Sequence, residues 1–344
     1  MQALQKIAPA FGVALREVPE PRAPSAHEVL IEVAATGLCG TDVHIYEWTP
    51  GYERVASALP VTLGHEFAGH VVDAGSDVRD LVRGCCVAVR PSVVCGRCEA
   101  CLRGDDEECV RRTGLGITRD GGLAKLVLVP AENCVPVPAG LEPEIAALTE
   151  PMTVCAAAVT TGGVKAGDRV LVLGPGTIGQ GMALFARDAG AEQVVVVGRD
   201  DAARLDALRG IGFPDVVDSR DRELEDALQP WLAYGRFDVV LEATGASATI
   251  GPALDVLKTH GTLVVAGIHS APASIDLTRL VRARQQIRGA YRAPVATWPR
   301  VVDFLAHHRD LVRPMISHRV PLSNAIEGFE LTRSRAASKV LILP

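Results

Sequence analysis

The sequence lacks an excess of positive charge and lacks long apolar runs. Its formal net charge is -6, which gives no electrostatic reason to bind nucleic acid or an anionic membrane surface. The longest apolar runs, VLVLG and VVVVG, have the length of strands and are far shorter than a membrane span. The amino-terminal residues contain no apolar segment of signal-peptide length, so we expect a cytoplasmic protein.

The length and composition are those of a globular protein with two domains. A chain of 344 residues exceeds what one hydrophobic core usually supports. The apolar share of 48% and the charged share of 22% are ordinary for globular chains. In a reducing compartment the nine cysteines are interpreted as metal ligands and core residues before disulfides.

Two different patterns divide the chain. Up to about residue 138, short strand-like segments alternate with turns rich in glycine and proline, which predicts a compact, bent β-domain. Residues 141–168 begin with helical spacing and form the passage between domains. From residue 169 to about 290, buried Val/Leu strands alternate with predicted helices over 178–190, 200–212 and 252–260. Continuous apolar strands separated by helices predict an α/β region with a parallel sheet covered on both faces.

A thiol, an imidazole and a carboxylate occur in two loops of the first region, at Cys39, His65 and Glu66. Such a set suits a tetrahedral zinc ion whose remaining position is open to water or substrate. Between them lie a hydroxyl at Thr41 and a second imidazole at His44. From these residues alone, a buried cysteine and a hydrogen-bonded core histidine are an equally good interpretation.

Four cysteines follow at short spacing: Cys95, Cys98, Cys101 and Cys109. Four thiolates that close on one ion form a structural zinc site, which has no open position and performs no catalysis. Disulfides are the alternative, and the absence of an export signal disfavours them.

The glycines of Gly174-x-Gly176-x-x-Gly179 follow a buried strand and open a predicted helix. In that setting they indicate a dinucleotide-binding loop: a tight turn, close approach of the pyrophosphate, and close packing of helix on strand. The next strand ends in Gly198 and Arg199, where an acidic residue would hold the adenosine ribose hydroxyls. A guanidinium without a carboxylate favours a 2′-phosphate, and therefore NADP(H) over NAD(H).

Together these motifs resemble the zinc-dependent medium-chain alcohol dehydrogenases, in their threonine dehydrogenase and sorbitol dehydrogenase branch. The resemblance covers essentially the whole chain and rests on CGTDVHIYEW, LGHEFAG, the four-cysteine lobe, TEPMTV and GPGTIG. It implies a GroES-like catalytic domain (1–150 and 291–344, with the lobe at about 90–112) and a Rossmann nucleotide-binding domain (151–290). It also implies a homodimer or homotetramer.

The resemblance assigns roles by position. Cys39, His65 and Glu66 would ligate the catalytic zinc, and Glu150 would join them or lie close by. Thr41 and His44 would pass the alcohol proton toward solvent. The positions expected near the cofactor, beyond Gly198 and Arg199, are Gly174, Gly176, Ile178, Gly179, Gly267 and Ile268.

The expected activity is hydride transfer between a secondary alcohol, either a polyol or a β-hydroxy amino acid, and a nicotinamide cofactor. An L-threonine 3-dehydrogenase that uses NAD is the alternative within the family, although Gly198 departs from the NAD-using pattern. A zinc-free quinone or enoyl reductase is the rival enzyme, and the joint presence of Cys39, His65 and Glu66 argues against it. The alternative from another class is a zinc module that binds nucleic acid or protein, and the dinucleotide-binding loop disfavours it. Two zinc ions per chain would support the dehydrogenase.

Overall fold

A computed structural model describes residues 1–344 and divides them into two compact units. The first unit comprises Met1–Glu150 and Trp298–Pro344, and the second comprises Pro151–Thr297. The second unit therefore extends beyond residue 290, the end expected from the sequence. No helix is long and apolar enough to cross a bilayer.

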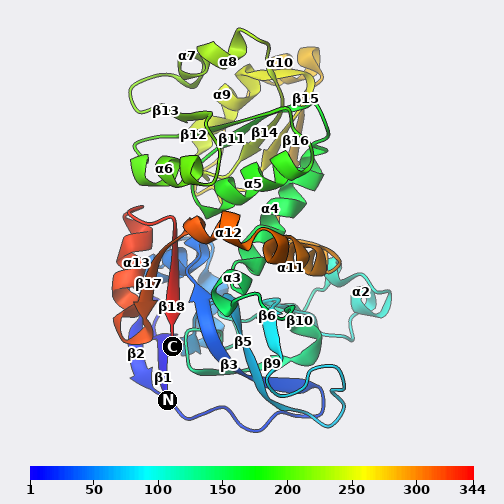
Figure 1. Ribbon diagram of the computed structural model, residues 1–344, viewed down its shortest axis with the longest axis vertical. Helices are drawn as coiled ribbons and strands as arrows, with labels where there is room; N and C mark the ends of the chain where they lie inside the picture. Colours follow the sequence, from blue (N-terminus) through cyan, green and yellow to red (C-terminus); the bar gives the residue numbers. More distant parts are fainter. The chain divides into compact units, whose positions relative to one another are not determined.

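The first unit is built on sheets that are antiparallel except for the parallel pair β17–β18 (Figure 1). Its seven-stranded sheet has the order β10 (Cys134–Pro136), β6 (Cys86–Val89), β5 (Glu66–Ala74), β3 (Glu28–Gly37), β18 (Lys339–Leu343), β17 (Ile316–Pro321), with β9 (Leu126–Pro130) also paired to β3. A three-stranded sheet contains β2 (Ala14–Glu17), β1 (Gln2–Lys6) and β4 (Val61–Thr62). The last strand of the chain thus returns to the first domain.

Short helices connect and cover these sheets. They are α1 (Gly40–Glu47), α2 (Glu99–Leu102), α3 (Pro143–Ala146), α11 (Thr297–His307), α12 (Arg309–Val312) and α13 (Ala325–Arg333). A small pair of strands, β7 (Ser92–Val93) and β8 (Thr113–Gly114), flanks the segment with the four cysteines. Helix α4 (Thr149–Gly162) begins at the last residues of the first unit and continues into the second.

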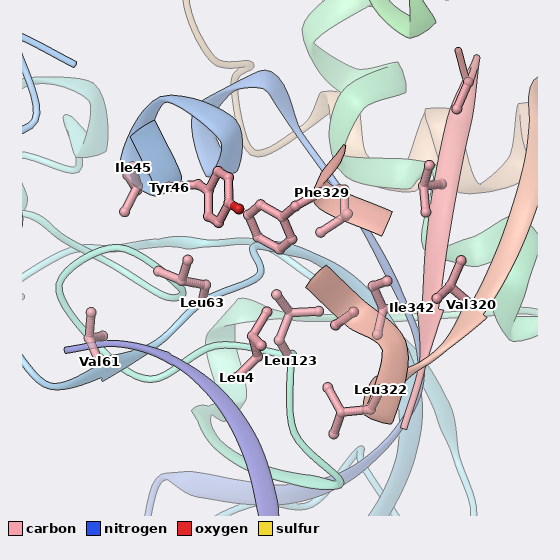
Figure 2. Packing of buried hydrophobic residues seen from close by; sticks show 14 of the residues in the cluster. Leu4, Ile45, Tyr46, Val61, Leu63, Leu123, Val320, Leu322, Phe329 and Ile342 are labelled. Carbon is pink, nitrogen blue, oxygen red and sulfur yellow. The ribbon is translucent and has the colours of Figure 1, made fainter. Parts of the chain in front are cut away.

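A buried cluster fixes helix α1 on the first unit (Figure 2). Ile45 and Tyr46 of α1 pack with Leu4 of β1, Phe329 of α13 and Ile342 of β18. The Tyr46 and Phe329 rings lie 5.2 Å apart between centroids. Burying each such side chain contributes roughly 1.5–3 kcal/mol, so α1 is held by packing despite its short length.

The second unit is a six-stranded parallel sheet. Its order is β13 (Val216–Asp218), β12 (Gln193–Gly198), β11 (Arg169–Leu173), β14 (Phe237–Glu242), β15 (Leu257–Val265), β16 (Gln286–Gly289). Its helices are α5 (Thr177–Asp188), α6 (Ala202–Gly210), α7 (Leu224–Ala227), α8 (Gln229–Leu232), α9 (Ile250–Asp255) and α10 (Leu277–Ala283).

Both faces of this sheet are covered, as expected. Leu171, Val195 and Leu263 pack with α7 and α9 in one apolar cluster. On α4, a Cβ added to Gly162 would contact Val239 and Val264, whose positions alternate with that set. The GroES-like and doubly wound α/β fold class is therefore confirmed.

The helix predicted over 252–260 is partly wrong. Helix α9 ends at Asp255, and β15 begins at Leu257. Leu257 pairs in parallel with Phe237 of β14, so strand pairing prevails over the helical spacing of the apolar residues.

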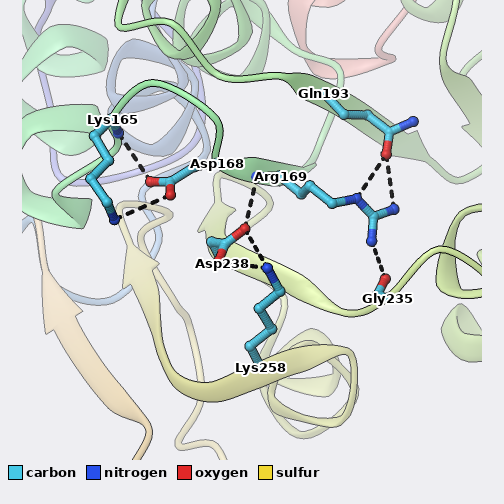
Figure 3. A network of polar contacts seen from close by, with 7 residues as sticks. All are labelled: Lys165, Asp168, Arg169, Gln193, Gly235, Asp238 and Lys258. Carbon is cyan, nitrogen blue, oxygen red and sulfur yellow. Dashed lines mark hydrogen bonds and ion pairs between the residues drawn. The ribbon is translucent and has the colours of Figure 1, made fainter.

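A polar network ties the amino ends of the central strands together (Figure 3). The guanidinium of Arg169, at the start of β11, donates to Gln193 Oε1 at 3.1 and 2.8 Å and also to the Gly235 carbonyl. Asp238 accepts from the Arg169 backbone N–H at 2.9 Å and from Lys258 Nζ. The carboxyl ends of the same strands carry the glycine-rich loop.

Candidate active site and cofactor loop

The structure brings Cys39, His65 and Glu66 together in the first unit. Their ligand atoms all lie within 4.8 Å of one another. Cys39 precedes α1, Glu66 begins β5, and Gly37 at the end of β3 is the register partner of Glu66. Pairing of β3 with β5 therefore places the two loops at the same end of the sheet.

Burial and charge make this cluster a site that favours a cation. His65 is 5% exposed and Glu66 1% exposed. Burial raises the pKa of the Cys39 thiol, and the Glu66 carboxylate raises it further. Burial alone would lower the pKa of His65, but Asp42 and Cys39 raise it well above its ordinary value. A divalent ion would stabilise the thiolate and the neutral imidazole that this packing otherwise opposes.

Asp42 is a candidate site residue that the sequence did not reveal. Its carboxylate is fully buried; Oδ2 accepts from the Cys39 N–H at 3.0 Å, and Oδ1 lies 3.5 Å from His65 Nδ1. Neither Asp42 Oδ1 nor His65 Nδ1 has a hydrogen-bond partner. A carboxylate behind the imidazole is the arrangement that orients a metal-ligating histidine, so the residues present fit a zinc ion.

Glu150 lies at the start of α4, in electrostatic range of the cluster. Burial raises the pKa of Glu150 to about 7; His65 lowers it and Glu66 raises it. Its carboxylate is not among the three groups that lie within ligand distance of one another.

Lys339 is the second residue that sequence reasoning missed. Its ammonium donates to Glu66 Oε2 at 2.6 Å and to the Leu38 carbonyl at 2.9 Å. Burial alone would lower the pKa of Lys339, but the Glu66 and Cys39 charges raise it. No motif marks this lysine; only the return of β18 to the sheet places it here.

Thr41 and His44 both lie on α1. The Thr41 hydroxyl is half-buried, and no hydrogen bond engages it. His44 Nδ1 lies 3.2 Å from Thr49 Oγ1, and the ring stacks on Tyr52 with centroids 5.5 Å apart and planes at 19°. Those two neighbours fix the orientation of the imidazole.

The four lobe cysteines also come together. The Sγ atoms of Cys98 and Cys101 lie 3.4 Å apart, those of Cys95 and Cys101 lie 3.9 Å apart, and all four ligand atoms fall within 4.8 Å. These separations exceed a disulfide bond, and all nine cysteines are free. The backbone N–H of Cys101 lowers the pKa of Cys98 to about 6, whereas burial and the Cys98 sulfur raise that of Cys101 to about 12. Neighbouring thiolates oppose one another unless a cation binds, so this set fits a structural zinc ion.

In the second unit, the glycine-rich loop has the shape that a pyrophosphate requires. Gly174 has φ +104°, and a Cβ at Gly179 would overlap the Gly174 carbonyl oxygen. Gly176 is the N-cap residue of α5, and a Cβ there would meet open space. The N–H groups and the dipole at a helix N-terminus favour an anion. Ile178 follows in the first turn of α5.

Arg199 remains available after Gly198 at the end of β12. Asp200 pairs with Arg220 at 2.6 Å, and Asp201 pairs with Arg204 at 3.3 Å. Arg199 is exposed and forms no ion pair. The neighbouring acids therefore do not neutralise it.

Buried Glu242 shapes the loop that contains Gly267 and Ile268. Its Oε1 accepts from the Gly245 N–H at 2.9 Å, and its Oε2 lies 3.0 Å from His269 Nε2. The carboxylate joins the loops after β14 and β15, and Ile268 stays 56% exposed. Sequence reasoning named this loop but not the glutamate that holds it.

Comparison with known proteins identifies the family. Residues 25–139 match the family described as Alcohol dehydrogenase GroES-like domain, and residues 177–307 match Zinc-binding dehydrogenase. L-threonine 3-dehydrogenase of Rhizobium etli is 33% identical over 99% of this chain and 98% of its own length. The enzyme of that name from Bacillus licheniformis is 34% identical over 100% and 99%.

Solved structures agree along the whole chain. A protein of Sinorhizobium meliloti described as a zinc-binding dehydrogenase bound to NADP is 32% identical with a TM-score of 0.89, covering 100% of this chain and 99% of that one. 2R,3R-butanediol dehydrogenase of Bacillus subtilis is 25% identical with a TM-score of 0.89 and the same coverage. The chain belongs to the zinc-dependent medium-chain alcohol dehydrogenase family, in its threonine and sorbitol dehydrogenase branch. It is an oxidoreductase that acts on the CH–OH group of alcohols.

Proposed function

We propose that this chain transfers a hydride between a secondary alcohol, of polyol or β-hydroxy amino acid type, and NADP(H), with a catalytic zinc ion held by Cys39, His65 and Glu66. The buried cluster of these three side chains carries the proposal. Thiolate, imidazole and carboxylate leave one position of a tetrahedral ion for the substrate. Glu150 joins the ligands or stays beside them.

Residues of α1 carry the proton of the alcohol from the site to solvent. Bound zinc supplies a Lewis acid that favours the ionised alcohol, and bound nicotinamide accepts the hydride. The Thr41 hydroxyl, free of protein hydrogen bonds, accepts the substrate proton as it passes its own proton on toward His44. His44 exchanges that proton with water, because an imidazole does so near neutral pH. Thr49 engages Nδ1 of His44, which leaves Nε2 for the exchange.

Replacing His44 tests the relay. His44→Ala should lower turnover most near neutral pH, by roughly a hundredfold, the effect of losing a general base. Added imidazole should restore part of the rate, whereas Thr49→Val should shift the pH–rate profile while keeping the imidazole. An unchanged profile in His44→Ala removes His44 from the mechanism.

A second zinc ion, in the lobe of Cys95, Cys98, Cys101 and Cys109, holds this surface segment together. Metal analysis should find two zinc ions per chain. One zinc per chain contradicts the proposal and favours a zinc-free reductase or a zinc-binding module.

The preference for NADP(H) rests on Arg199. A charge-assisted hydrogen bond to the 2′-phosphate contributes roughly 1.5–3 kcal/mol, or about ten- to a hundredfold in affinity. Arg199→Ala should therefore weaken NADPH binding by that factor and leave NADH binding unchanged. Arg209→Ala is the matched control, since Arg209 is an exposed arginine on α6 paired with Asp206. The NADP-bound relative supports this preference. Gly198→Asp is a poorer test, because a Cβ there would lie 2.9 Å from Pro175.

The alternative is L-threonine 3-dehydrogenase with NAD, which the names of the relatives support. A panel of threonine, sorbitol, xylitol, butanediol and simple secondary alcohols, each with both cofactors, separates the two. Highest kcat/KM for threonine with NAD contradicts the main proposal.

We also propose that the protein is a cytoplasmic homodimer or homotetramer. Sedimentation of the purified chain determines its oligomeric state.

A further inference from the structure

A buried ion pair lies directly behind the candidate metal ligand Glu66. The side chains of Lys339 and Glu66 are 2% and 1% exposed, and their charged atoms lie 2.6 Å apart. A buried lysine is costly unless it is paired, and both partners here are fully desolvated. The pair joins residues 273 positions apart in sequence.

The glycine at position 37 of β3 leaves room for the Lys339–Glu66 pair. Gly37 of β3 lies opposite Leu341 of β18 and opposite Glu66 of β5. A Cβ at Gly37 would overlap Glu66 Oε2. Because Gly37 has no side chain, the ammonium of Lys339 reaches across β3 to the carboxylate and also binds the Leu38 carbonyl.

The contact engages only one oxygen of the carboxylate. Oε2 accepts the hydrogen bond from Lys339 at 2.6 Å, and Oε1 does not share that bond. We propose that Lys339 is a positioning residue that restricts Glu66 to one-oxygen binding of the catalytic metal, so that a position stays open for substrate. This inference rests on the proposed metal site.

Charge balance supports the same assignment. Cys39 as thiolate, Glu66, Glu150 and the Asp42 carboxylate would bring four negative charges to one buried site. A zinc ion would offset two of them, and Lys339 offsets one more. A purely structural lysine would need the ion pair but would not influence how the carboxylate binds the metal.

Cobalt(II) in place of zinc reports the coordination directly, because its visible absorption is strong in four-coordinate sites and weak in five- or six-coordinate sites. The spectrum of the parent minus that of Cys39→Ser isolates the catalytic site from the lobe. We expect a strong, four-coordinate band without substrate and cofactor. A weak band in the parent overturns the proposal; no band at all instead contradicts the proposed metal site itself.

Lys339→Met then frees Oε2 at nearly constant side-chain length. The expected result is retained cobalt with a weaker band, and a fall in kcat of about 10–100-fold with KM little changed. Lys339→Gln, which keeps a hydrogen-bond donor, should lie between parent and Lys339→Met and carries the same measurement if the methionine variant does not fold. Lys258→Met is the matched control, since Lys258 pairs with Asp238 at 2.8 Å in the second unit. Identical bands in parent and folded variant, or an equal change in the control, overturn the role of Lys339.

Discussion

The two candidate metal sites of the first unit differ in how they are assembled. The lobe draws four identical ligands from Cys95 to Cys109, on a surface segment with only short helices and a two-stranded sheet. The cluster of Cys39, His65 and Glu66 draws three different ligands from separate loops, and buried polar partners support them. The lobe would thus depend on a bound metal for its local fold, whereas the surrounding fold already holds the residues of the mixed cluster in place.

Removing the thiol of the mixed cluster should have the largest effect. A catalytic metal contributes several kcal/mol to the reaction, so Cys39→Ser should lower kcat by about a thousandfold. Circular dichroism and the lobe zinc should remain as in the parent. Cys86→Ser, a half-buried strand cysteine outside both sites, should keep turnover within about twofold, as expected of a substitution that removes no metal ligand. Loss of both zinc ions in Cys39→Ser, with an unfolded spectrum, contradicts the division of roles.

Removing the carboxylate behind His65 should have the next largest effect, on the zinc affinity of the mixed cluster. Asp42→Asn removes the charge behind His65 and should lower zinc affinity in the catalytic site by about 10–100-fold. Competition with a chelator measures that affinity, and the lobe zinc serves as an internal reference. Asp120→Asn, which alters a carboxylate that accepts from the Thr62 N–H at 2.8 Å, is the control. Equal chelator sensitivity of parent and Asp42→Asn removes Asp42 from the site.

Loss of a lobe cysteine should lower the local stability of the lobe and leave the catalytic reaction intact. Cys98→Ser should remove one zinc ion and increase the rate of limited trypsin cleavage near Arg97 and Arg103, by about tenfold for each 1.4 kcal/mol of local stability lost. The catalytic zinc should stay bound. Unchanged cleavage together with loss of turnover means that the two sites are not independent.

The same contrast explains what sequence can predict. The grouping of the four lobe cysteines follows from the sequence, because they stand close together and share one residue type. The zinc ion that they would hold stays a prediction. Cys39, His65 and Glu66 were named from short motifs, and the pairing of β3 with β5 brings them together. Asp42 lies inside the first motif, but only the distance to His65 reveals it. Lys339 could not be predicted, since its position depends on β18 pairing with β3.

In the fold, too, local patterns were predicted from the sequence and features that depend on strand pairing were not. Alternating strands and helices predicted the parallel sheet, whose strands are continuous Val/Leu runs. The error at residues 257–260 arose where apolar residues fit both a helix and a strand, and the pairing with Phe237 decides between them. Strand β13 and helix α10 gave no clear signal, because one has three residues and the other has no fully buried side chain.

The smallest expected effect is on stability, at the exposed ion pair of Arg22 and Glu28. It serves as a comparison for the buried pair of Lys339 and Glu66. Arg22 lowers the pKa of Glu28 to about 2 from its usual 4.5, burial opposes this shift, and Ser25 adds to it. Because the pKa is depressed in the folded state, the stabilisation is complete above about pH 4.5 and disappears as the pH falls toward 2. Arg22 is 61% exposed, so solvent screening keeps the contribution of this pair small. Glu28→Gln should lower the urea midpoint slightly at pH 7, and the difference from the parent should shrink by pH 3. A difference that stays constant between pH 7 and pH 3 would show that the carboxylate acts through its shape and hydrogen bonds, without a contribution from its charge.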